Sequence, residues 1–481
     1  MKLRLLGHGE RYAVEQLQLA LFPEEPMEQT DAPFSGNGAV SALHRGKLYL
    51  TATAKITLHG RTVHAARRMK CAQEDVSSRR RLLQNAYYAA AMLLRDPPEW
   101  GSLSGVRPTK LTTRHLLAGG TAESAERLLQ ENYHVTPARS RLAAECSLAT
   151  VQAARRLRET DVSLYLGIPF CPTRCVYCSF VSQTTGRQGA LLEPYLDALE
   201  REIEVTARLL RETGRTVRTL YIGGGTPTTL STPQLRRLMQ TIRAHFDLSS
   251  LIEYTVEGGR PDTLDSEKLR ALKALGCGRV SINPQTMQSS VLRRIGRCHS
   301  PEQTRTAYLQ AREAGFEAIN MDLIAGLPTD TPAGFADSLS QVLELQPANI
   351  TVHTLALKKG ADLYFSREEL PTAEAVREML ADTETRLRAA GYKPYYLYRQ
   401  KYMSGSFENV GWTKPGFECL YNIYMMEELH SIISLGGGGM TKINLPDGRL
   451  ERLHNPKFPQ QYIARIDDVL AQKAAAAELF R

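Results

Sequence analysis

The sequence has no apolar run of the length that a membrane span requires. The longest such run, residues 86–94, is far shorter than the ~20 residues of a transmembrane helix. The start of the chain also lacks the apolar core of a secretory signal peptide, because the apolar run before Gly7 is only two residues long, Leu5 and Leu6. We therefore expect a soluble, cytoplasmic protein with no membrane partner.

Cysteine is scarce, with eight residues in a chain of 481. So few and so unevenly spread cysteines exclude a disulfide scaffold, and clustered thiols in a reducing cytosol indicate metal or redox chemistry. Disorder is excluded for most of the chain, because 42% hydrophobic and 23% charged residues are typical of globular proteins. At roughly 150 residues per domain, the length suggests two to four domains.

The positive charge is concentrated in one part of the chain. The net charge of +9 comes from 60 Lys and Arg against 51 Asp and Glu. Residues 1–160 contain 23 basic and 15 acidic residues, or +8, which leaves 37 against 36, or +1, for the remaining 321. The overall charge therefore gives no support to an acidic substrate in the larger part, and it bears on the partner of the first 160 residues.

Residues 1–160 predict an α+β domain without a chemical motif. Extended segments are expected at 2–6, 38–43 and 47–57, and helices at 79–94 and 121–130.

From Asp161 onward, short apolar runs alternate with amphipathic stretches. The expected strands are 163–168, 219–222, 252–256, 279–282, 318–324 and 350–355, and the helices between them are 191–212, 232–246, 265–275, 301–314 and 332–345. This alternation predicts a parallel sheet, either open or curled into a barrel.

Unusual polar and glycine residues follow the carboxyl ends of these strands, where the loops of a parallel sheet converge on one active site. A C-x3-C-x2-C run of Cys171, Cys175 and Cys178 follows the first strand, and a glycine run follows the second. Single residues follow or lie on the others: Glu257, Gln285, Asp322 and His353. Three thiolates in one loop suit an iron-sulfur cluster, whereas structural zinc requires a fourth ligand that is missing at a sensible spacing. A four-iron cluster with three protein ligands leaves one iron open for a small molecule.

The cysteine loop resembles that of the radical S-adenosylmethionine (SAM) superfamily. The resemblance implies an α/β fold with a partial parallel (β/α)6 TIM-like barrel of radical SAM type, here with an N-terminal α+β domain and a C-terminal α/β extension. The expected boundaries are 1–160, 161–360 and 361–481. It also implies a 4Fe-4S cluster whose open iron binds one SAM, with room for a second. Cleavage of SAM then gives a 5′-deoxyadenosyl radical, and the protein supplies orientation.

More narrowly, the chain is similar to the oxygen-independent coproporphyrinogen III oxidases, or coproporphyrinogen dehydrogenases, of haem biosynthesis. The matching stretches are 165–171, 221–228, 294–299 and 320–328, and the tail resembles the branch with a long N-terminal extension. The resemblance implies cofactor-binding roles for a set of positions: Tyr165, Tyr177, Gly224, Gly225, Thr226, Glu257, Gln285, Arg297, Asp322, Ala356 and Met440. It assigns no catalytic side chain beyond the cluster and SAM.

The implied activity is an anaerobic oxidative decarboxylation of two propionates of coproporphyrinogen III, giving protoporphyrinogen IX. Candidates for holding the substrate carboxylates are Arg399, Lys401 and Lys414, and a flavodoxin or ferredoxin is expected as reductant. Nucleic acid is not expected as a partner. One departure keeps alternatives open, because Phe180 replaces a cysteine of the dehydrogenases, and the haem-chaperone relatives have an aromatic residue there. The alternatives are a haem-binding chaperone without decarboxylation, or another radical SAM enzyme that modifies porphyrin or RNA.

Overall fold

The computed structural model describes the chain except residues 23–24, 26, 106, 367–368, 401–406 and 481. The chain divides into two compact units. The first contains Met1–Ser147 and Arg399–Phe407, and the second contains Leu148–Tyr398 and Glu408–Arg481. The division into three parts at residues 160 and 360 stays a prediction.

The first unit is built on a five-stranded sheet of order β2-β1-β3-β4-β5. Its elements are β1 (Lys2–Leu6), α1 (Arg11–Leu21), β2 (Glu28–Gln29), β3 (Gly38–Arg45), β4 (Tyr49–Leu58), β5 (Arg61–Lys70) and α2 (Val76–Ala91). Apolar residues alternate along β4, where Leu50, Ala52, Ala54 and Ile56 are buried in the core beneath α1 and α2. The three strands expected here are confirmed, whereas α1 and β5 were not predicted.

Two further helices belong to this unit, α3 (Thr109–Leu117) and α4 (Ala122–Tyr133), and the division between the units falls within α5 (Pro137–Ala154). Two helices of the unit begin at a reciprocal cap. Asp75 caps α2 and Thr121 caps α4, each accepting a hydrogen bond from the backbone N–H three residues on. The predicted start of α4 lies within one residue of the observed one, whereas α2 begins three residues before its predicted start, because Asp75 is its cap and Ser78 lies in its first turn.

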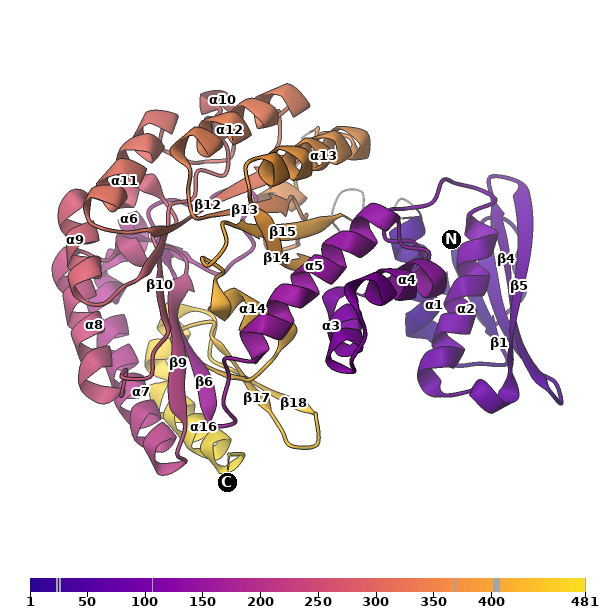
Figure 1. The fold of residues 1–481 in the computed structure, drawn as a ribbon, viewed down its shortest axis with the longest axis horizontal. Coiled ribbons are helices and arrows are strands. Elements are labelled where there is room, and N and C mark those ends of the chain that lie inside the picture. The colour runs from indigo at the N-terminus through magenta and orange to yellow at the C-terminus, as the bar shows by residue number, and fades with distance from the viewer. Residues whose placement is uncertain (23–24, 26, 106, 367–368, 401–406, 481) are drawn as a thin grey trace. The chain divides into compact units, whose positions relative to one another are not determined.

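The second unit contains the predicted parallel strands in sequence order: β6 (Asp161–Ile168), β9 (Thr216–Gly224), β10 (Glu253–Glu257), β11 (Arg279–Ser281), β12 (Ala318–Ala325) and β13 (Asn349–Thr354). They are buried on both faces and therefore form near-continuous apolar runs in the sequence. The helices that alternate with them lie around the outside of the curved sheet (Figure 1). The expected α/β partial barrel is confirmed.

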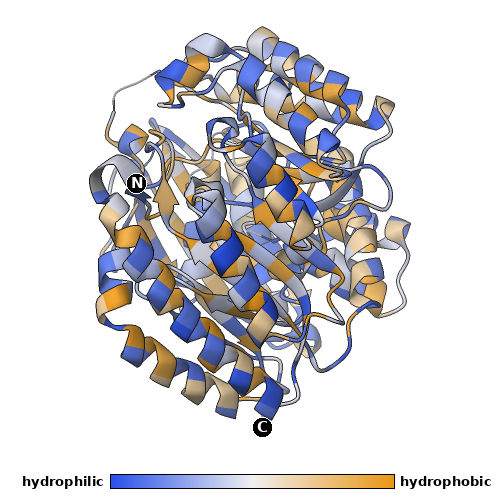
Figure 2. Cartoon of the chain, turned by 90° about the vertical axis from the view of Figure 1, so that its left-hand side faces the viewer, coloured by the Kyte–Doolittle hydropathy of each residue, from blue (hydrophilic) through white to orange (hydrophobic). Residues whose placement is uncertain are grey.

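The longer of these helices are α7 (Leu192–Glu212), α8 (Thr232–His245), α9 (Ser266–Ala274), α11 (Pro301–Glu313) and α12 (Pro332–Leu345), with short α6 (Thr185–Gln188) and α10 (Ser289–Arg294) between them. Ser231, Asp265, Ser300 and Thr331 cap four of them. Hydrophilic and hydrophobic residues alternate along these helices in Figure 2, as expected where one face packs on a sheet and the other meets water.

The C-terminal segment extends both edges of the barrel sheet. Its elements are α13 (Ala373–Ala389), β14 (Lys393–Arg399), β15 (Glu408–Thr413), α14 (Leu420–Glu427), β16 (Ser431–Leu435), β17 (Met440–Asn444), β18 (Leu450–His454), α15 (Pro459–Ala464) and α16 (Ile466–Glu478). β15 pairs antiparallel with β13, and β16 pairs parallel with β6. Among the described residues, no helix combines the length and hydrophobicity of a membrane span.

Candidate functional site

The cysteine loop leaves the carboxyl end of β6 and is held in place from two sides. Cys171 ends the short strand β7 (Phe170–Cys171), which pairs with β8 (Gln183–Thr184), and Cys175 and Cys178 follow in a turn. Val176 N–H donates to the Ile295 carbonyl at 3.1 Å, and its own carbonyl accepts from Leu363 N–H at 2.8 Å. The loop that carries the sulfurs is therefore anchored to both neighbouring segments.

The donor set of this loop fits an iron-sulfur cluster. Burial raises the pKa of Cys171 and raises that of Cys178 to about 11, so a positively charged group beside them is required to hold thiolates at neutral pH. Within the described ranges, no three His, Cys, Asp or Glu side chains are arranged to hold a single metal ion. In an iron-sulfur cluster each thiolate binds a separate iron, and three thiols in one loop match that donor set.

The glycine run after β9 packs directly against this loop. Gly225 N–H donates to the Ile168 carbonyl at 2.9 Å, and Thr226 N–H donates to the Phe170 carbonyl at 2.7 Å. A Cβ at Gly225 would lie 2.5 Å from the Phe170 oxygen and 3.0 Å from Cys171 Sγ, and Gly224 has a φ of +110°. The Thr226 hydroxyl donates to Cys171 Sγ at 3.4 Å. Two predicted site segments thus meet, and the close approach requires glycine.

Glu257 ends β10 beside the same glycine run. The Tyr221 hydroxyl donates to its Oε1 at 2.5 Å, and a Cβ at Gly223 would lie 3.1 Å from its Oε2. Burial raises the pKa of Glu257 to about 7, and the negative charge of Asp322 also raises it, against the hydrogen bond from Tyr221. The carboxyl group therefore changes its charge near neutral pH.

Three tyrosines stack inside the barrel next to this carboxyl group. The ring centroid of Tyr165 lies 6.2 Å from that of Tyr221 and 6.3 Å from that of Tyr421, and the last two are 4.5 Å apart. Tyr221 and Tyr421 were not among the predicted site residues. Tyr221 could have been found from the sequence, because it lies on β9 two residues before the glycine run. Tyr421 lies on α14, and no sequence motif around it indicates a role in the site.

Asp322 lies in a polar group on β12 and β13. Its Oδ1 accepts from Asn320 Nδ2 at 2.7 Å, and its Oδ2 is 3.6 Å from His353 Nε2. Burial alone would raise the pKa of Asp322, but the hydrogen bond and charge of His353 together with the Asn320 bond lower it overall. The Tyr398 hydroxyl lies 3.5 Å from His353 Nδ1. Asp322 is thus held as a carboxylate next to Glu257, which carries a raised pKa.

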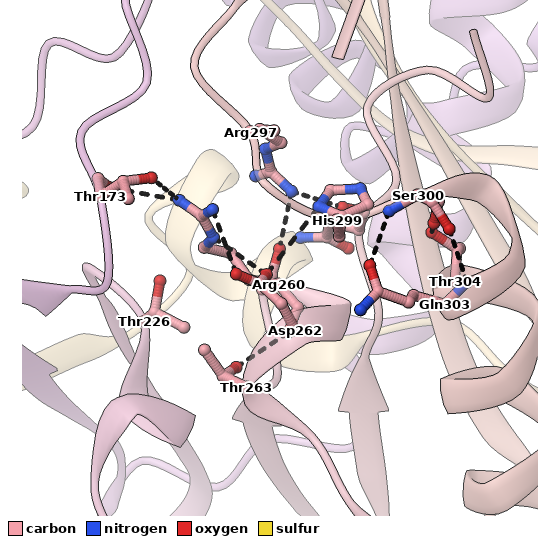
Figure 3. Close-up of polar contacts among 12 residues, drawn as sticks. Thr173, Thr226, Arg260, Asp262, Thr263, Arg297, His299, Ser300, Gln303 and Thr304 are labelled. Atoms are coloured by element: carbon pink, nitrogen blue, oxygen red, sulfur yellow. Dashed lines mark hydrogen bonds and ion pairs between the residues drawn. The ribbon is translucent and has the colours of Figure 1, made fainter. Parts of the chain in front are cut away.

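Gln285 and Arg297 bring buried polar atoms to the same end of the barrel. Gln285 has a φ of +67° and exchanges backbone hydrogen bonds with β12, while its buried Oε1 has no hydrogen-bond partner among the described residues. Arg297 donates to the Asn283 carbonyl at 2.7 Å and the Gly259 carbonyl at 3.2 Å, and its Nε is likewise buried and unpartnered there (Figure 3). Buried polar atoms of this kind fit a polar ligand.

A charged network that was not predicted fixes the start of the cysteine loop. Arg260 donates to the Thr173 hydroxyl at 2.7 Å and the Thr173 carbonyl at 3.2 Å, and pairs with Asp262 at 3.2 Å (Figure 3). Burial, together with the charge of Arg297, lowers the pKa of the neighbouring His299 to about 3. Arg260 could have been predicted as a site residue from its position in the sequence, directly after the Gly258–Gly259 pair that follows β10.

The remaining cofactor candidates lie at other strand ends. Tyr177 instead lies within the cysteine loop, partly buried and beside Arg297, and desolvation raises its pKa. Ala356 follows β13, and Met440 begins β17 after the second glycine run. A Cβ at Gly436 would lie 2.4 Å from the Gly167 oxygen, so this run packs on the end of β6. Among the described residues, no contact of Ala356 or Met440 indicates that either side chain binds a cofactor.

The structure describes two of the three substrate candidates, and each is described in its own unit. Lys414 donates to the Gln346 carbonyl at 3.1 Å, and its backbone N–H bonds to Ala348, at the amino end of β13 and thus opposite the cysteine loop. Arg399 lies in the first unit, where it donates to the Leu103 carbonyl at 2.6 Å over the Trp100 ring. Lys401 lies outside the described residues. Phe180 is 68% exposed beside the cysteine loop.

Comparison with known proteins adds to this geometry. The family model described as "Radical SAM superfamily" matches residues 165–342. The oxygen-independent coproporphyrinogen-III oxidase-like protein HemZ of Bacillus subtilis is 38% identical over 382 residues, covering 78% of this chain and 76% of that protein. The heme chaperone HemW of Escherichia coli is 29% identical over 303 residues, covering 63% and 75%.

Two further relatives carry the oxidase name itself. The oxygen-independent coproporphyrinogen III oxidase of Pseudomonas aeruginosa is 39% identical over 238 residues, which are 48% of this chain and 51% of that protein. The solved structure of coproporphyrinogen III oxidase (HemN) from Escherichia coli, titled a radical SAM enzyme, matches with a TM-score of 0.54 and 28% identity over 67% of this chain and 73% of that one.

Proposed function

Because the chain belongs to the radical SAM superfamily, in the family of oxygen-independent coproporphyrinogen-III oxidase-like proteins, we propose that it is an oxidoreductase acting on coproporphyrinogen III. In the proposed reaction two propionate side chains each lose one hydrogen atom, one carbon dioxide and one electron, giving the vinyl groups of protoporphyrinogen IX. The observation that carries the proposal is the meeting of the cysteine loop and the glycine run at one barrel end in a chain that spans three quarters of an oxidase-like relative.

The proposed cofactors follow from the family, which implies a 4Fe-4S cluster and SAM. Cys171, Cys175 and Cys178 would hold the cluster, and when bound the two groups supply one-electron chemistry that removes a hydrogen atom from an unactivated carbon. Gly225 lets the backbone approach Cys171, and Thr226 donates to its sulfur. Arg260 holds the Thr173 end of the loop, so these residues orient the sulfurs.

SAM would lie between the glycine run and the buried polar groups of the barrel. Gly224, Gly225 and Thr226 would take its methionyl end, with Tyr165 nearby, and Tyr177 would pack on its adenine. Glu257 would accept from the ribose hydroxyls once it is ionised. Gln285, Arg297 and Asp322 offer further polar contacts, and the roles of Ala356 and Met440 rest on the family pattern alone.

For the substrate, we propose His353 as a donor to a propionate carboxylate. Its side chain is 27% exposed and lies on the polar inner face of the barrel, next to Asp322 and Tyr398. Arg399 and Lys401 stay candidates from the tail. Lys414 is left out, because it lies at the opposite end of β13.

The test is an anaerobic incubation of the reconstituted protein with SAM, a low-potential reductant, an electron acceptor and coproporphyrinogen III. Mass spectrometry should show SAM-dependent loss of two carbon dioxides from the porphyrinogen. The matched control is Cys175→Ala, which should give none. SAM cleavage without any decarboxylation by the intact holoprotein would contradict the proposed activity.

A second candidate is a haem-binding chaperone, favoured by one observation. Phe180, exposed beside the cysteine loop, stands where the decarboxylating enzymes have a cysteine, and the HemW relatives are named heme chaperones. Anaerobic titration of the holoprotein with haem separates the two. Stoichiometric haem binding together with unchanged coproporphyrinogen III would establish the chaperone function.

A further inference from the structure

The N-terminal sheet carries a positive charge that the sequence does not balance locally. Between Asp31 and Glu74 there is no acidic residue. This segment, which forms β3, β4 and β5, contains Arg45, Lys47, Lys55, Arg61, Arg67, Arg68 and Lys70. The +8 of the first 160 residues is therefore concentrated in these strands.

Strand register places Lys55, Arg68 and Lys70 on one face, which Lys2 and Arg4 of β1 share, whereas Arg45, Arg61 and Arg67 pair with residues of the other face. Tyr49, Thr51 and Lys55 of β4 stand opposite Lys70, Arg68 and His64 of β5, and directly paired residues share a face. The pairing continues the same face to the other strands: His44 of β3 opposes Thr51, and Arg4 of β1 aligns with Val40, which opposes Lys55. We call this set the open face: Lys2, Arg4, His44, Tyr49, Thr51, Thr53, Lys55, His64, Arg68 and Lys70.

The open face is the one that α1 and α2 do not cover. Leu50, Ala52, Ala54 and Ile56, which alternate with the residues of the open face along β4, are buried in the helix-covered core. Figure 1 shows α2 lying along one side of the sheet. By contrast, Thr53, Lys55, His64, Arg68 and Lys70 are exposed. The sheet thus has one core face and one solvated face.

The charges of the open face are not neutralised within the unit. In the part of the chain that the structure describes, no carboxylate pairs with Lys55, Arg68 or Lys70, and the Arg68 guanidinium lies over the Tyr49 ring at 5.1 Å. Arg45, Arg79 and Arg80 differ, because they pair with Glu74 or Glu10. Among the described strand residues, the acidic side chain aligned with the open face is Glu28, opposite Lys2 at the β2 edge.

The chemistry of the open face matches a phosphate backbone better than a protein. On this face β4 carries Thr51, Thr53 and Lys55, and β5 carries Arg68 and Lys70, with Ala66 and His64 at the alternate positions before them. Lysine, arginine and threonine side chains bind phosphate oxygens. Protein interfaces have an apolar or aromatic centre and are depleted in lysine. The exposed large side chains here are Leu6, Leu48 and Tyr49; Leu6 lies on β1, apart from Tyr49 at the start of β4 and Leu48 directly before it, with Thr51 and His44 between them.

We propose that the open face of the N-terminal sheet binds single-stranded RNA through its phosphate backbone. This places a nucleic acid on the first unit, independently of the reaction proposed for the barrel. The recognition is electrostatic, since the face offers several cations and one exposed ring, and it is therefore salt-dependent and weakly sequence-selective.

The experiment measures fluorescence anisotropy of a labelled single-stranded RNA of mixed sequence with the full-length, anaerobically purified protein at several salt concentrations. The variant is Lys55→Gln with Arg68→Gln and Lys70→Gln. The charge-matched control is Arg114→Gln with Arg127→Gln and Arg141→Gln, which are exposed on α3, α4 and α5. Equal thermal midpoints establish that both variants fold.

The open-face variant should bind RNA at least about tenfold more weakly in low salt. Its slope of log affinity against log salt should fall by about 2, at ~0.7 per lost phosphate contact. The control should bind as the unaltered protein does. Equal losses in both variants would overturn the proposal, because net charge alone would then explain binding. So would the absence of RNA binding, or binding to vesicles of anionic phospholipid in preference to RNA.

Discussion

At the scale of the residue, the cysteines of the loop after β6 carry the cofactor proposal. Cys171→Ala, Cys175→Ala and Cys178→Ala should each abolish the brown 4Fe-4S chromophore and SAM cleavage, because three ligands are the minimum that leaves only one iron open. Absorbance spectra of the reconstituted variants check this. Cys298→Ala, which removes an exposed thiol outside the loop, should keep the chromophore. Full cluster absorbance in any of the three loop variants would overturn the ligand assignment.

Glu257 should make SAM binding depend on pH. Its pKa of about 7 means that the carboxyl group is mostly protonated at pH 6 and mostly ionised at pH 8. Only the ionised form can accept from both ribose hydroxyls, so the affinity for SAM should rise about tenfold between these pH values, one unit on either side of the pKa. Equilibrium dialysis with labelled SAM measures it. Glu257→Gln should bind weakly and without this pH dependence, and an unchanged pH profile would remove Glu257 from the site.

His353 and Lys414 give opposite expectations for the substrate. Loss of one charge-assisted hydrogen bond in His353→Ala should weaken binding of coproporphyrin III, a stable oxidised analogue, roughly tenfold. Lys414→Gln should bind it as the unaltered protein does, because Lys414 lies at the far end of β13. Absorbance titrations compare the two. A defect in the Lys414 variant alone would mean that the substrate lies elsewhere.

At the scale of the element, the turn after β9 depends on the absence of a side chain. Gly225→Ala would push a methyl group to within 2.5 Å of the Phe170 oxygen, so the glycine run has to move away from the cysteine loop. We expect a destabilisation of ~1–3 kcal/mol and loss of the cluster. Gly186→Ala is the matched control, because a Cβ there meets no atom within 4 Å. Thermal unfolding and cluster absorbance check both variants, and a stable Gly225 variant with a normal cluster would refute the close-approach argument.

The elements that were predicted are those with a strong local pattern. The six parallel strands are buried on both faces, so their apolar runs stand out between helices with polar caps, as at Ser231 and Ser300. β5 was missed because it is an edge strand with exposed basic residues, and α5 because its apolar residues are spread around the helix. Sequence pattern thus finds elements whose burial is simple and misses those whose burial depends on neighbours.

The site residues likewise divide into those that the sequence pattern predicts and those that only the folded chain brings together. Residues at or directly after strand ends, such as Cys171, Gly225 and Glu257, could be placed together because parallel topology brings the carboxyl ends of the strands to one edge. Tyr421 and Tyr398 come from the tail, about 200 and 45 residues from Tyr221 and His353, and only the folded chain brings each pair together. The position of Lys414 at the amino end of β13 likewise follows only from the fold, because the antiparallel direction of β15 carries it there.

At the scale of the whole molecule, the charge and the proposed chemistry lie in different parts of the chain. The strands of the first unit hold the excess of positive charge, while residues 161–481 are nearly neutral and contain the cysteine loop. Removing open-face charges should therefore leave SAM cleavage unchanged.

The central claim is that three cysteines of the barrel hold a cluster with one iron open to SAM. The most direct test is electron paramagnetic resonance of the reduced, reconstituted protein with and without SAM. We predict the spectrum of a reduced 4Fe-4S cluster that shifts when SAM is added, because the open iron gains new ligands. A cluster spectrum that SAM leaves unchanged, or a protein that binds zinc and no iron, would contradict the account.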